Sequence, residues 1–508
     1  MTYFMKNMHI VTLKKISPYF FLTTLIFALQ GGIVFSHLNL EEVAIASQDE
    51  FTFKHFSEEL LALIKEGEIR KVLDFGPHYA YGFLFWFFSA VLVYLFSFLG
   101  DAALFSIFRA LSLMLLSGAL FFIYKTLRIY QTKNISLLAT LSILGFPMFH
   151  FFGKIYSVEY VITFLSCYCV YNFFKSHDYD RPYFIGLFSI GLAVGFKLNA
   201  ATLLVFPALY VIKFRLKNHY KVICKSFSIV ALGFFIVNPV LLFSSKAWYV
   251  LFSYIPSSTH LTIPQRIEMW FSGNYFHYYE AFPLLGIKYS VGIMTLLACT
   301  FLIFITGYNG FRLKKKFEAL SIPIFVFSNI FIVSTKSDHL FYWYLFPAFI
   351  LMPLVFMFNN KANPILISIF ILSMIPNYEN IKNQYYTKQY VYEFLDYKYS
   401  SSERLIEYIN QVPDKTRILT TLRVLVGDEN RKRLNLNQLA VPANVEKKLT
   451  KFPDTQYILV EKPIMKFKEL YVNYRLPDDF FSEQVEISEM VFENVLETET
   501  DIVLKKRT

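Results

Sequence analysis

Ser47-Gln48-Asp49-Glu50 lies shortly after the first long apolar segment of the chain, residues 16–35. About 20 consecutive apolar residues suffice to cross the hydrocarbon core of a bilayer as a helix. Lys6, Lys14 and Lys15 precede this segment, and basic flanks favour the cytoplasmic side. A cleaved signal peptide is the alternative, but no small-residue cleavage pattern follows closely. We therefore expect an uncleaved anchor, with the acidic pair Asp49-Glu50 outside the cytoplasm.

The composition indicates a membrane protein. Of 508 residues, 55% are hydrophobic, 19% are aromatic and only 17% are charged, and the mean hydropathy is +0.42. These values lie far from those of a soluble domain. The net charge of +11 is explained by basic cytoplasmic loops that face anionic membrane lipids, so no nucleic-acid partner is expected. The four cysteines lack the spacing of a metal site or a disulfide framework.

Further apolar segments predict more membrane spans. If these spans alternate, the basic clusters at 125–133, 213–221 and 312–316 all fall on the cytoplasmic side. The predicted fold class is a polytopic α-helical membrane protein with about 11 transmembrane helices. The predicted spans after the first are 103–124, 135–152, 156–174, 184–196, 200–212, 223–243, 286–308, 320–334, 343–358 and 364–375.

Residues 79–99 are as apolar as these spans but break their parity. If they crossed the membrane, residues 125–133 would lie outside and Glu159 inside. We therefore predict a juxtamembrane or re-entrant helix in a large first external loop, 36–102, buried against protein as such segments must be. A true crossing with a shifted count is the alternative.

The composition changes after Pro376. Long apolar runs stop, and short alternating pieces typical of strands (416–421, 456–460 and 500–504) occur among charged, helix-like stretches such as 401–410. The predicted domains are a transmembrane domain, 1–376, and a small external α/β domain, 377–508.

Ionisable residues near the external ends of the spans are the candidates for chemistry, because charge in lipid is costly and is retained for a reason. Asp49 and Glu50 alone are weak evidence, since an acidic pair in a loop is usually a solvated feature. Glu159 begins a span, where a carboxylate also complements the helix dipole. Lys197 stands between two short apolar runs. It is either a snorkelling lysine or a cation that binds a lipid phosphate.

Together these pieces resemble glycosyltransferase family 39, which comprises the protein O-mannosyltransferases that use dolichyl-phosphate-mannose and bacterial relatives such as the lipid A aminoarabinose transferases. These are membrane enzymes of the GT-C fold. The resemblance covers residues 48 to 204, with a later piece around Tyr342. It is carried by Asp49-Glu50, Phe75-Gly76-Pro77-His78-Tyr79, residues 104–113 around Arg109, Tyr156-Ser157-Val158-Glu159, residues 191–197 ending in Lys197, and His339 to Pro347.

One departure from the family pattern is visible, and the signatures of two other branches of the superfamily, which are therefore disfavoured, are missing. His78 follows the proline, whereas the family has the basic residue before it. The Trp-Trp-Asp signature of oligosaccharyltransferases and the His-Pro-Asp-Glu signature of glycolipid-anchor mannosyltransferases are absent from the sequence.

The resemblance implies transfer of one sugar, a hexose or a pentose, from a polyprenyl-phosphate sugar to an external lipid, polysaccharide or protein acceptor, with inversion at the anomeric carbon. It implies no required cofactor, with a divalent cation, Mg or Mn, left open. We expect a bacterial inner membrane with an external active site. The implied roles are general base for Asp49, orientation of that base or of the acceptor for Glu50, and contact with the sugar, the acceptor or a divalent ion for Glu159. Donor phosphate binding is implied for Lys197 with Arg109, Lys336 or His339, and substrate binding for His78, Tyr156 and Tyr342.

A transporter or flippase of lipid-linked sugars is the alternative from another class. Such proteins tend to show internal repeats and ionisable residues at mid-span, whereas here the candidate groups collect at one interface. A structural membrane protein whose external domain binds a partner is a third reading, but it leaves the pattern from the carboxylates to Lys197 unexplained.

Overall fold

The computed structural model divides into two compact units, one holding Met1–Leu38 and Asp49–Ile381 and the other Asn39–Gln48 and Lys382–Thr508. The first unit holds the long helices and the second holds the larger sheet. The structure describes residues 17–34, 48–75, 81–145, 156–213, 219–254, 279–282, 287–289, 307–313, 315–336, 347, 350–358, 404–421, 430, 433–439, 445–461, 484–487, 489–498 and 501–507.

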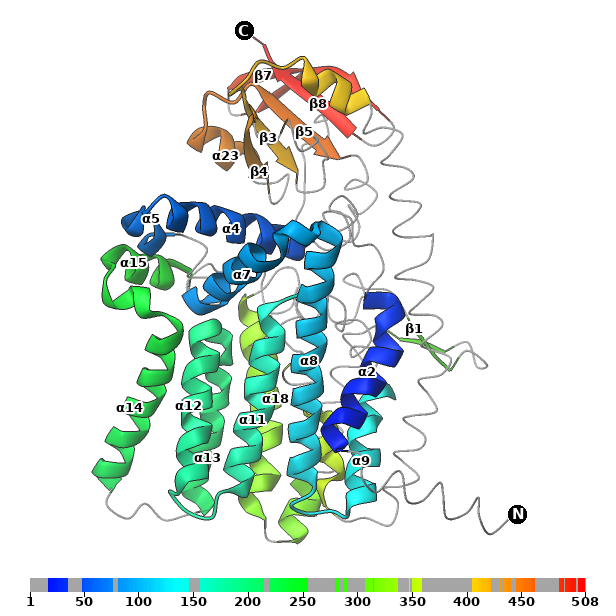
Figure 1. Ribbon diagram of the computed structural model, residues 1–508, viewed down its shortest axis with the longest axis vertical. Helices are drawn as coiled ribbons and strands as arrows, with labels where there is room; N and C mark the ends of the chain where they lie inside the picture. The colour runs from blue at the N-terminus through cyan, green and yellow to red at the C-terminus, as the bar shows by residue number, and fades with distance from the viewer. Residues whose placement is uncertain are drawn as a thin grey trace. The chain divides into compact units, whose positions relative to one another are not determined.

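The first unit is built from long apolar helices that run side by side (Figure 1). α11 packs between α8 and α12, α12 packs on α14, α2 packs on α8, and α13 packs on α18. The bounds of these helices are α2 Pro18–Val34, α8 Asp101–Leu127, α11 Val158–Lys175, α12 Arg181–Phe196, α13 Val205–Lys213, α14 His219–Val237 and α18 Lys316–Lys336.

The helix ends follow from local sequence. α8 begins after Gly100, whose φ is +87°, and it carries Asp101 in its first turn and Lys125 in its last, as the helix dipole favours. α12 is capped by Asp180, the residue before its first, whose carboxylate accepts the backbone N–H of Tyr183. Each end is thus specified by one or two residues.

α12 and α14 approach each other closely through two glycines. A Cβ added to Gly191 would collide with the carbonyl oxygen of Val230, and one on Gly233 would lie 2.7 Å from the carbonyl oxygen of Phe188. Small residues at such crossings allow helices to pack backbone to backbone. The end of α12 is therefore fixed against the end of α14.

Two of the described helices, α8 and α14, are long and apolar enough to cross a membrane by length and composition. Several expected spans differ from the helices found. Residues 135–152 form α9 (Lys133–Leu141) and η2 (Ser142–Gly145) before the described part ends, and 200–212 is divided between η3 (Leu198–Leu204) and α13. The predicted count of about 11 crossings stays a prediction.

The expected span at 286–308 is wrong at its start. Residues Ile287–Tyr289 form strand β2, which pairs antiparallel with β1 (Tyr279–Phe282). Within the expected span 343–358, the described residues include η6 (Met352–Met357), and 364–375 lies outside the described residues.

Residues 79–99 contain α7 (Phe83–Phe96), followed by η1 (Ser97–Leu99). The 14 residues of α7 extend over about 21 Å, less than the ~30 Å of a hydrocarbon core. Figure 1 shows α7 running obliquely to α8, with α4 (Gln48–Lys65) lying across the helix ends. This geometry is compatible with the predicted juxtamembrane or re-entrant helix.

The second unit contains a six-stranded mixed sheet in the order β4-β3-β5-β8-β7-β6. β3, β4 and β5 are parallel, whereas β8, β7 and β6 are antiparallel to their neighbours. The predicted strands at 416–421, 456–460 and 500–504 coincide with β3, β5 and β8. The bounds are β3 Arg417–Thr421, β4 Asn435–Leu439, β5 Tyr457–Glu461, β6 Gln484–Ile487, β7 Met490–Glu497 and β8 Asp501–Lys506.

Alternation along β3 builds a core on both faces of this sheet. Leu419 packs with Leu449 of α23 (Val445–Lys451) on one face. Ile418 packs with Leu405 and Ile409 of the helix at 404–410 on the other. Successive strand residues point to opposite faces, so one strand serves two hydrophobic layers.

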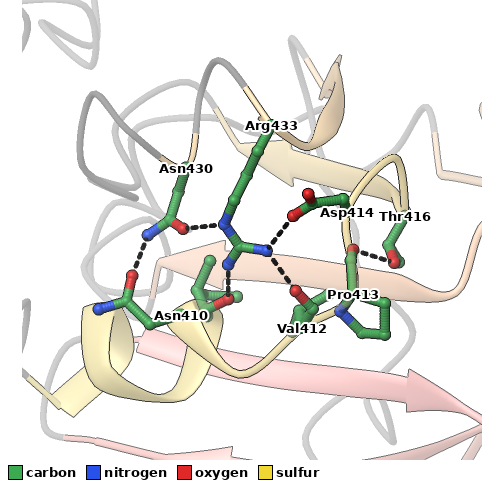
Figure 2. A network of polar contacts seen from close by, with 8 residues as sticks. Asn410, Val412, Pro413, Asp414, Thr416, Asn430 and Arg433 are labelled. Carbon is green, nitrogen blue, oxygen red and sulfur yellow. Dashed lines mark hydrogen bonds and ion pairs between the residues drawn. The ribbon is translucent and has the colours of Figure 1, made fainter.

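Arg433 caps the helix at 404–410 (Figure 2). Its guanidinium donates to the backbone carbonyls of Ile409 and Val412, to Asn430 Oδ1 at 2.8 Å and to Asp414 Oδ1 at 3.2 Å. The last carbonyls of a helix lack partners within it, and a cation there also complements the dipole. This network is a structural cap.

Candidate active site

α4 is joined to α8 by a buried ion pair. Glu50 is 0% exposed and Arg109 is 5% exposed. Arg109 Nε lies 3.0 and 3.1 Å from the two carboxylate oxygens, and Nη2 donates to Oε2 at 2.8 Å. Glu50 Oε1 also accepts the backbone N–H of Tyr156 at 2.7 Å. A buried charge is tolerated when it is paired and hydrogen-bonded in this way.

A second contact holds the same two helices nearer the surface. Lys54, one turn after Glu50, lies 3.0 Å from Glu58 and 3.3 Å from Asp101 at the start of α8. Burial alone would lower the pKa of Lys54, but the two carboxylates outweigh it and raise that pKa. α4 is therefore fixed both in position and in rotation.

The other ion pair joins α11 to the end of α12. Ser157 caps α11 by accepting the backbone N–H of Glu159 at 3.1 Å, and its hydroxyl donates to Glu159 Oε2. Lys197 Nζ donates to Glu159 Oε1 and lies 5.0 Å from the ring centroid of Tyr81. The side chains of Lys197 and Glu159 remain 13% and 9% exposed. This pair is somewhat more exposed than Glu50–Arg109, whose side chains are 0% and 6% exposed.

Stacked aromatic rings lie between the two ion pairs. Tyr156 stacks on Phe108 at 4.5 Å and on Phe85 at 5.2 Å, and its hydroxyl lies 2.8 Å from Ser89 Oγ. Phe53 of α4 meets both Tyr81 and Tyr156 edge to face, at 5.4 and 6.0 Å. Residues 156–159 thus contact Glu50 at one end and Lys197 at the other.

An apolar groove of about 580 Å³ adjoins this cluster. Its walls come from α2, α7, α8 and α11. Tyr156 belongs to the aromatic cluster, and Phe196 immediately precedes Lys197. The residues that line it are Tyr19, Leu84, Phe85, Phe88, Leu111, Met114, Leu115, Gly118, Phe121, Phe122, Tyr156, Val161, Phe164 and Phe196.

The structure brings together five of the residues predicted for the site, namely Glu50, Arg109, Tyr156, Glu159 and Lys197. Their proximity does not depend on whether residues 79–99 cross the membrane. Asp49 lies in α4, and Lys336 is the last residue of α18, but their side chains fall outside the described residues. His78, His339 and Tyr342 also lie outside the described residues.

The guanidinium of Arg109 binds both oxygens of Glu50. Its predicted part in donor phosphate binding stays a prediction. Tyr81 and Asn238 were not identified from the sequence as part of this region. Neither stands in a charge pattern, and only the fold brings them beside Lys197.

The described carboxylates do not form a divalent-cation site. Both oxygens of Glu159 are engaged by Ser157 and Lys197, and Glu50 is neutralised by Arg109. Within the described part of the chain there is no group of three or more His, Cys, Asp or Glu residues placed to hold a metal ion. We assign no step to Mg or Mn.

Comparison with solved structures identifies the architecture. The chain superimposes on ArnT from Cupriavidus metallidurans bound to undecaprenyl phosphate with a TM-score of 0.51 and 12% identity, covering 95% of this chain and 97% of that one. The chain has the GT-C membrane fold of ArnT. The apo state of the same ArnT superimposes with a TM-score of 0.48 and 12% identity, over the same shares of both chains.

The similarity to an archaeal enzyme is weaker. The Archaeoglobus fulgidus oligosaccharyltransferase in complex with Zn and sulfate superimposes with a TM-score of 0.42 and 15% identity, covering 75% of this chain and 59% of that one. No protein-family model matches the sequence, and no curated protein matches it either.

Proposed function

We propose that the chain is an integral-membrane inverting glycosyltransferase that moves one sugar from a polyprenyl-phosphate sugar to an acceptor on the external side of the membrane. The observation that carries this proposal is the Glu159–Lys197 pair beside the apolar groove. Phe196 lines the groove and directly precedes Lys197, so a lipid chain bound with its head beside Phe196 would bring its phosphate to Lys197. ArnT, whose fold this chain has, is known with undecaprenyl phosphate bound.

The groove suits the first part of a prenyl chain. Its volume of about 580 Å³ lies within the ~300–1,000 Å³ range of small-molecule sites, and aromatic and aliphatic side chains dominate its walls. A longer lipid would extend from the groove into the bilayer. The excess of Phe in the sequence supplies these walls at Phe85, Phe88, Phe121 and Phe122.

Asp49 is the residue we assign as general base. The acceptor hydroxyl oxygen attacks the anomeric carbon on the face opposite the phosphate, and its proton passes to the Asp49 carboxylate. The bond between the anomeric carbon and the phosphate oxygen breaks, and its electron pair leaves with the phosphate. The products are the inverted glycoside and polyprenyl phosphate. A positioned base contributes on the order of 10²–10⁴-fold.

Glu50 is not available for that role, because Arg109 and the Tyr156 N–H bind its oxygens. Successive residues of a helix differ in direction by about 100°, so we give the two adjacent carboxylates different roles. Asp49 occupies the position one turn before Phe53, which contacts Tyr81. Glu50 therefore acts by orienting α4, and Asp49 takes the proton.

Lys197 neutralises the phosphate. An ammonium has three donors, so contact with a phosphate does not require Lys197 to leave Glu159. Donors placed where charge develops stabilise the transition state directly. We assign to Glu159 the orientation of the ammonium and a contact with the sugar or acceptor.

The transferred sugar is a hexose or a pentose, and the acceptor is a lipid, a polysaccharide or a protein. The contacts that the protein makes with each substrate select among them. We place the enzyme in a bacterial inner membrane, with the N-terminus cytoplasmic and the domain at 377–508 external. The GT-C fold and the groove support the membrane location.

The test uses the full-length chain in phospholipid vesicles supplied with a panel of radiolabelled polyprenyl-phosphate sugars and crude envelope acceptors. We expect one donor to be cleaved and its sugar to appear on an acceptor with inverted anomeric configuration, determined by NMR. Asp49→Asn abolishes this transfer at unchanged abundance, whereas Glu59→Gln, which alters an exposed carboxylate of the same helix, does not.

Two outcomes contradict the proposal. Near-normal turnover in Asp49→Asn removes Asp49 from the mechanism. Movement of intact donor across the vesicle membrane without cleavage favours the transporter alternative.

A further inference from the structure

Asn238 connects three elements beside the candidate site. It directly follows α14 and is 7% exposed. Its Nδ2 donates to the carbonyl oxygen of Gly195, in the last turn of α12, at 2.7 Å. Its Oδ1 accepts the backbone N–H of Phe83, the first residue of α7, at 3.2 Å. One side chain thus joins the ends of α7, α12 and α14.

Both partners are groups that helix ends leave unsatisfied. The last carbonyls and the first N–H groups of a helix have no partner within it. An amide offers both a donor and an acceptor, so Asn238 satisfies one of each. A carboxylate would keep the bond from Phe83 but place its oxygen against the Gly195 carbonyl.

The same junction sets the distance between Tyr81 and Lys197. Each of these residues lies two positions from a partner of Asn238, since Tyr81 precedes Phe83 and Lys197 follows Gly195. Gly82 has φ +73°, and a Cβ there would lie 2.7 Å from the Gly195 carbonyl oxygen and 2.8 Å from Val237 Cγ1. The backbone at Gly82 therefore rests directly on the ends of α12 and α14.

We infer that Asn238 is a positioning residue that fixes the Lys197 ammonium over the Tyr81 ring and thereby aims it at the donor phosphate. This inference rests on the proposed function only for the identity of the phosphate. The placement of Lys197 by Asn238 is testable without any substrate.

The first experiment measures the reactivity of Lys197. Full-length chain in detergent is treated with an amine-acylating ester, and the modification rate of Lys197 is followed by peptide mass spectrometry. Losing one hydrogen bond worth about 1 kcal/mol should release the ammonium and raise this rate about fivefold in Asn238→Asp.

The matched control is Asn172→Asp. Asn172 is 4% exposed, and its amide donates to the Tyr168 carbonyl within α11 at 2.8 Å, so among the described residues its side chain bonds to no second element. We expect its Lys197 rate to equal that of the wild type. Should Asn238→Asp fail to accumulate, Asn238→Ser removes the double contact with a neutral side chain and takes its place. An unchanged Lys197 rate in the Asn238 variant overturns the inference.

The second experiment separates positioning from general destabilisation. In the transfer assay we expect Asn238→Asp to raise the donor KM about tenfold while kcat changes less. In a Lys197→Ala background the same substitution should cause no further loss of activity, because the effects of residues that act through one contact are not additive. A full additional loss in the double variant means that Asn238 acts elsewhere and overturns the inference. Absence of transfer in the wild type overturns the proposed function instead and leaves the acylation result standing.

Discussion

The two buried ion pairs near the groove are built from similar charges but differ in freedom. Arg109 binds both oxygens of a fully buried carboxylate, and the backbone N–H of Tyr156 completes the set. Lys197 binds one oxygen of Glu159, and both side chains remain partly exposed. A planar guanidinium fixes geometry, whereas an ammonium on a flexible stem is a point charge that can be shared.

The difference separates a structural pair from a functional one. Glu50–Arg109 fixes α4 on α8, which determines where Asp49 lies. Glu159–Lys197 adjoins the groove, where a ligand phosphate can share the ammonium. Four substitutions test this difference between the two ion pairs.

Glu50→Gln should have the largest effect, on stability. It leaves the Arg109 guanidinium buried without its counter-charge, and breaking a buried pair costs about 3–5 kcal/mol. Thermal unfolding of the purified chain in detergent should show a large loss, with Glu59→Gln unaffected. A melting temperature close to that of the wild type would show that the pair is not what fixes α4.

Lys197→Ala should affect transfer more than folding. Removing a donor aimed at developing charge lowers turnover by about 10²–10³-fold and weakens donor binding. The stability loss should be smaller than for Glu50→Gln, because Ser157 still donates to Glu159 and the carboxylate is partly exposed. An unchanged dependence of rate on donor concentration would place the phosphate elsewhere.

Patterns of apolarity and charge were sufficient to predict α8, α11, α12 and α18. They also predicted that Glu159 and Lys197 lie at the same interface of the membrane. They do not predict the Glu50–Arg109 contact, because it depends on the rotation of α4 about its axis and joins residues far apart in the chain. These patterns do not predict the contacts of Asn238 with α7 and α12 either, because a single neutral residue before a proline belongs to no pattern of charge or apolarity. β2 replaced part of an expected span because apolar content alone does not distinguish a strand from a helix.

Ser157→Ala should have a moderate effect on both the stability of the chain and the donor KM. Losing a side-chain N-cap costs about 1 kcal/mol, and Glu159 also loses the Ser157 donor. Unfolding and donor KM should therefore both change. The matched control is Thr132→Ala, because Thr132 precedes α9 without a side-chain cap bond. Equal melting temperatures for the two variants would contradict the capping role.

Lys54→Met should have the smallest effect. Lys54 bridges Glu58 and Asp101, but these carboxylates are 43% and 38% exposed, and such pairs contribute about 0–1 kcal/mol. The raised pKa of Lys54 means that this contribution is present below the usual lysine pKa and is lost as pH rises through the folded-state value.

The difference in unfolding free energy between wild type and Lys54→Met should therefore shrink at high pH and at ~1 M salt, where screening is strong. Lys71→Met, at an exposed pair with Glu68, supplies the control. A loss of unfolding free energy as large as that of Glu50→Gln would contradict this prediction. It would show that the exposed contact of Lys54 with Asp101 fixes α4 on α8 as strongly as the buried Glu50–Arg109 pair does.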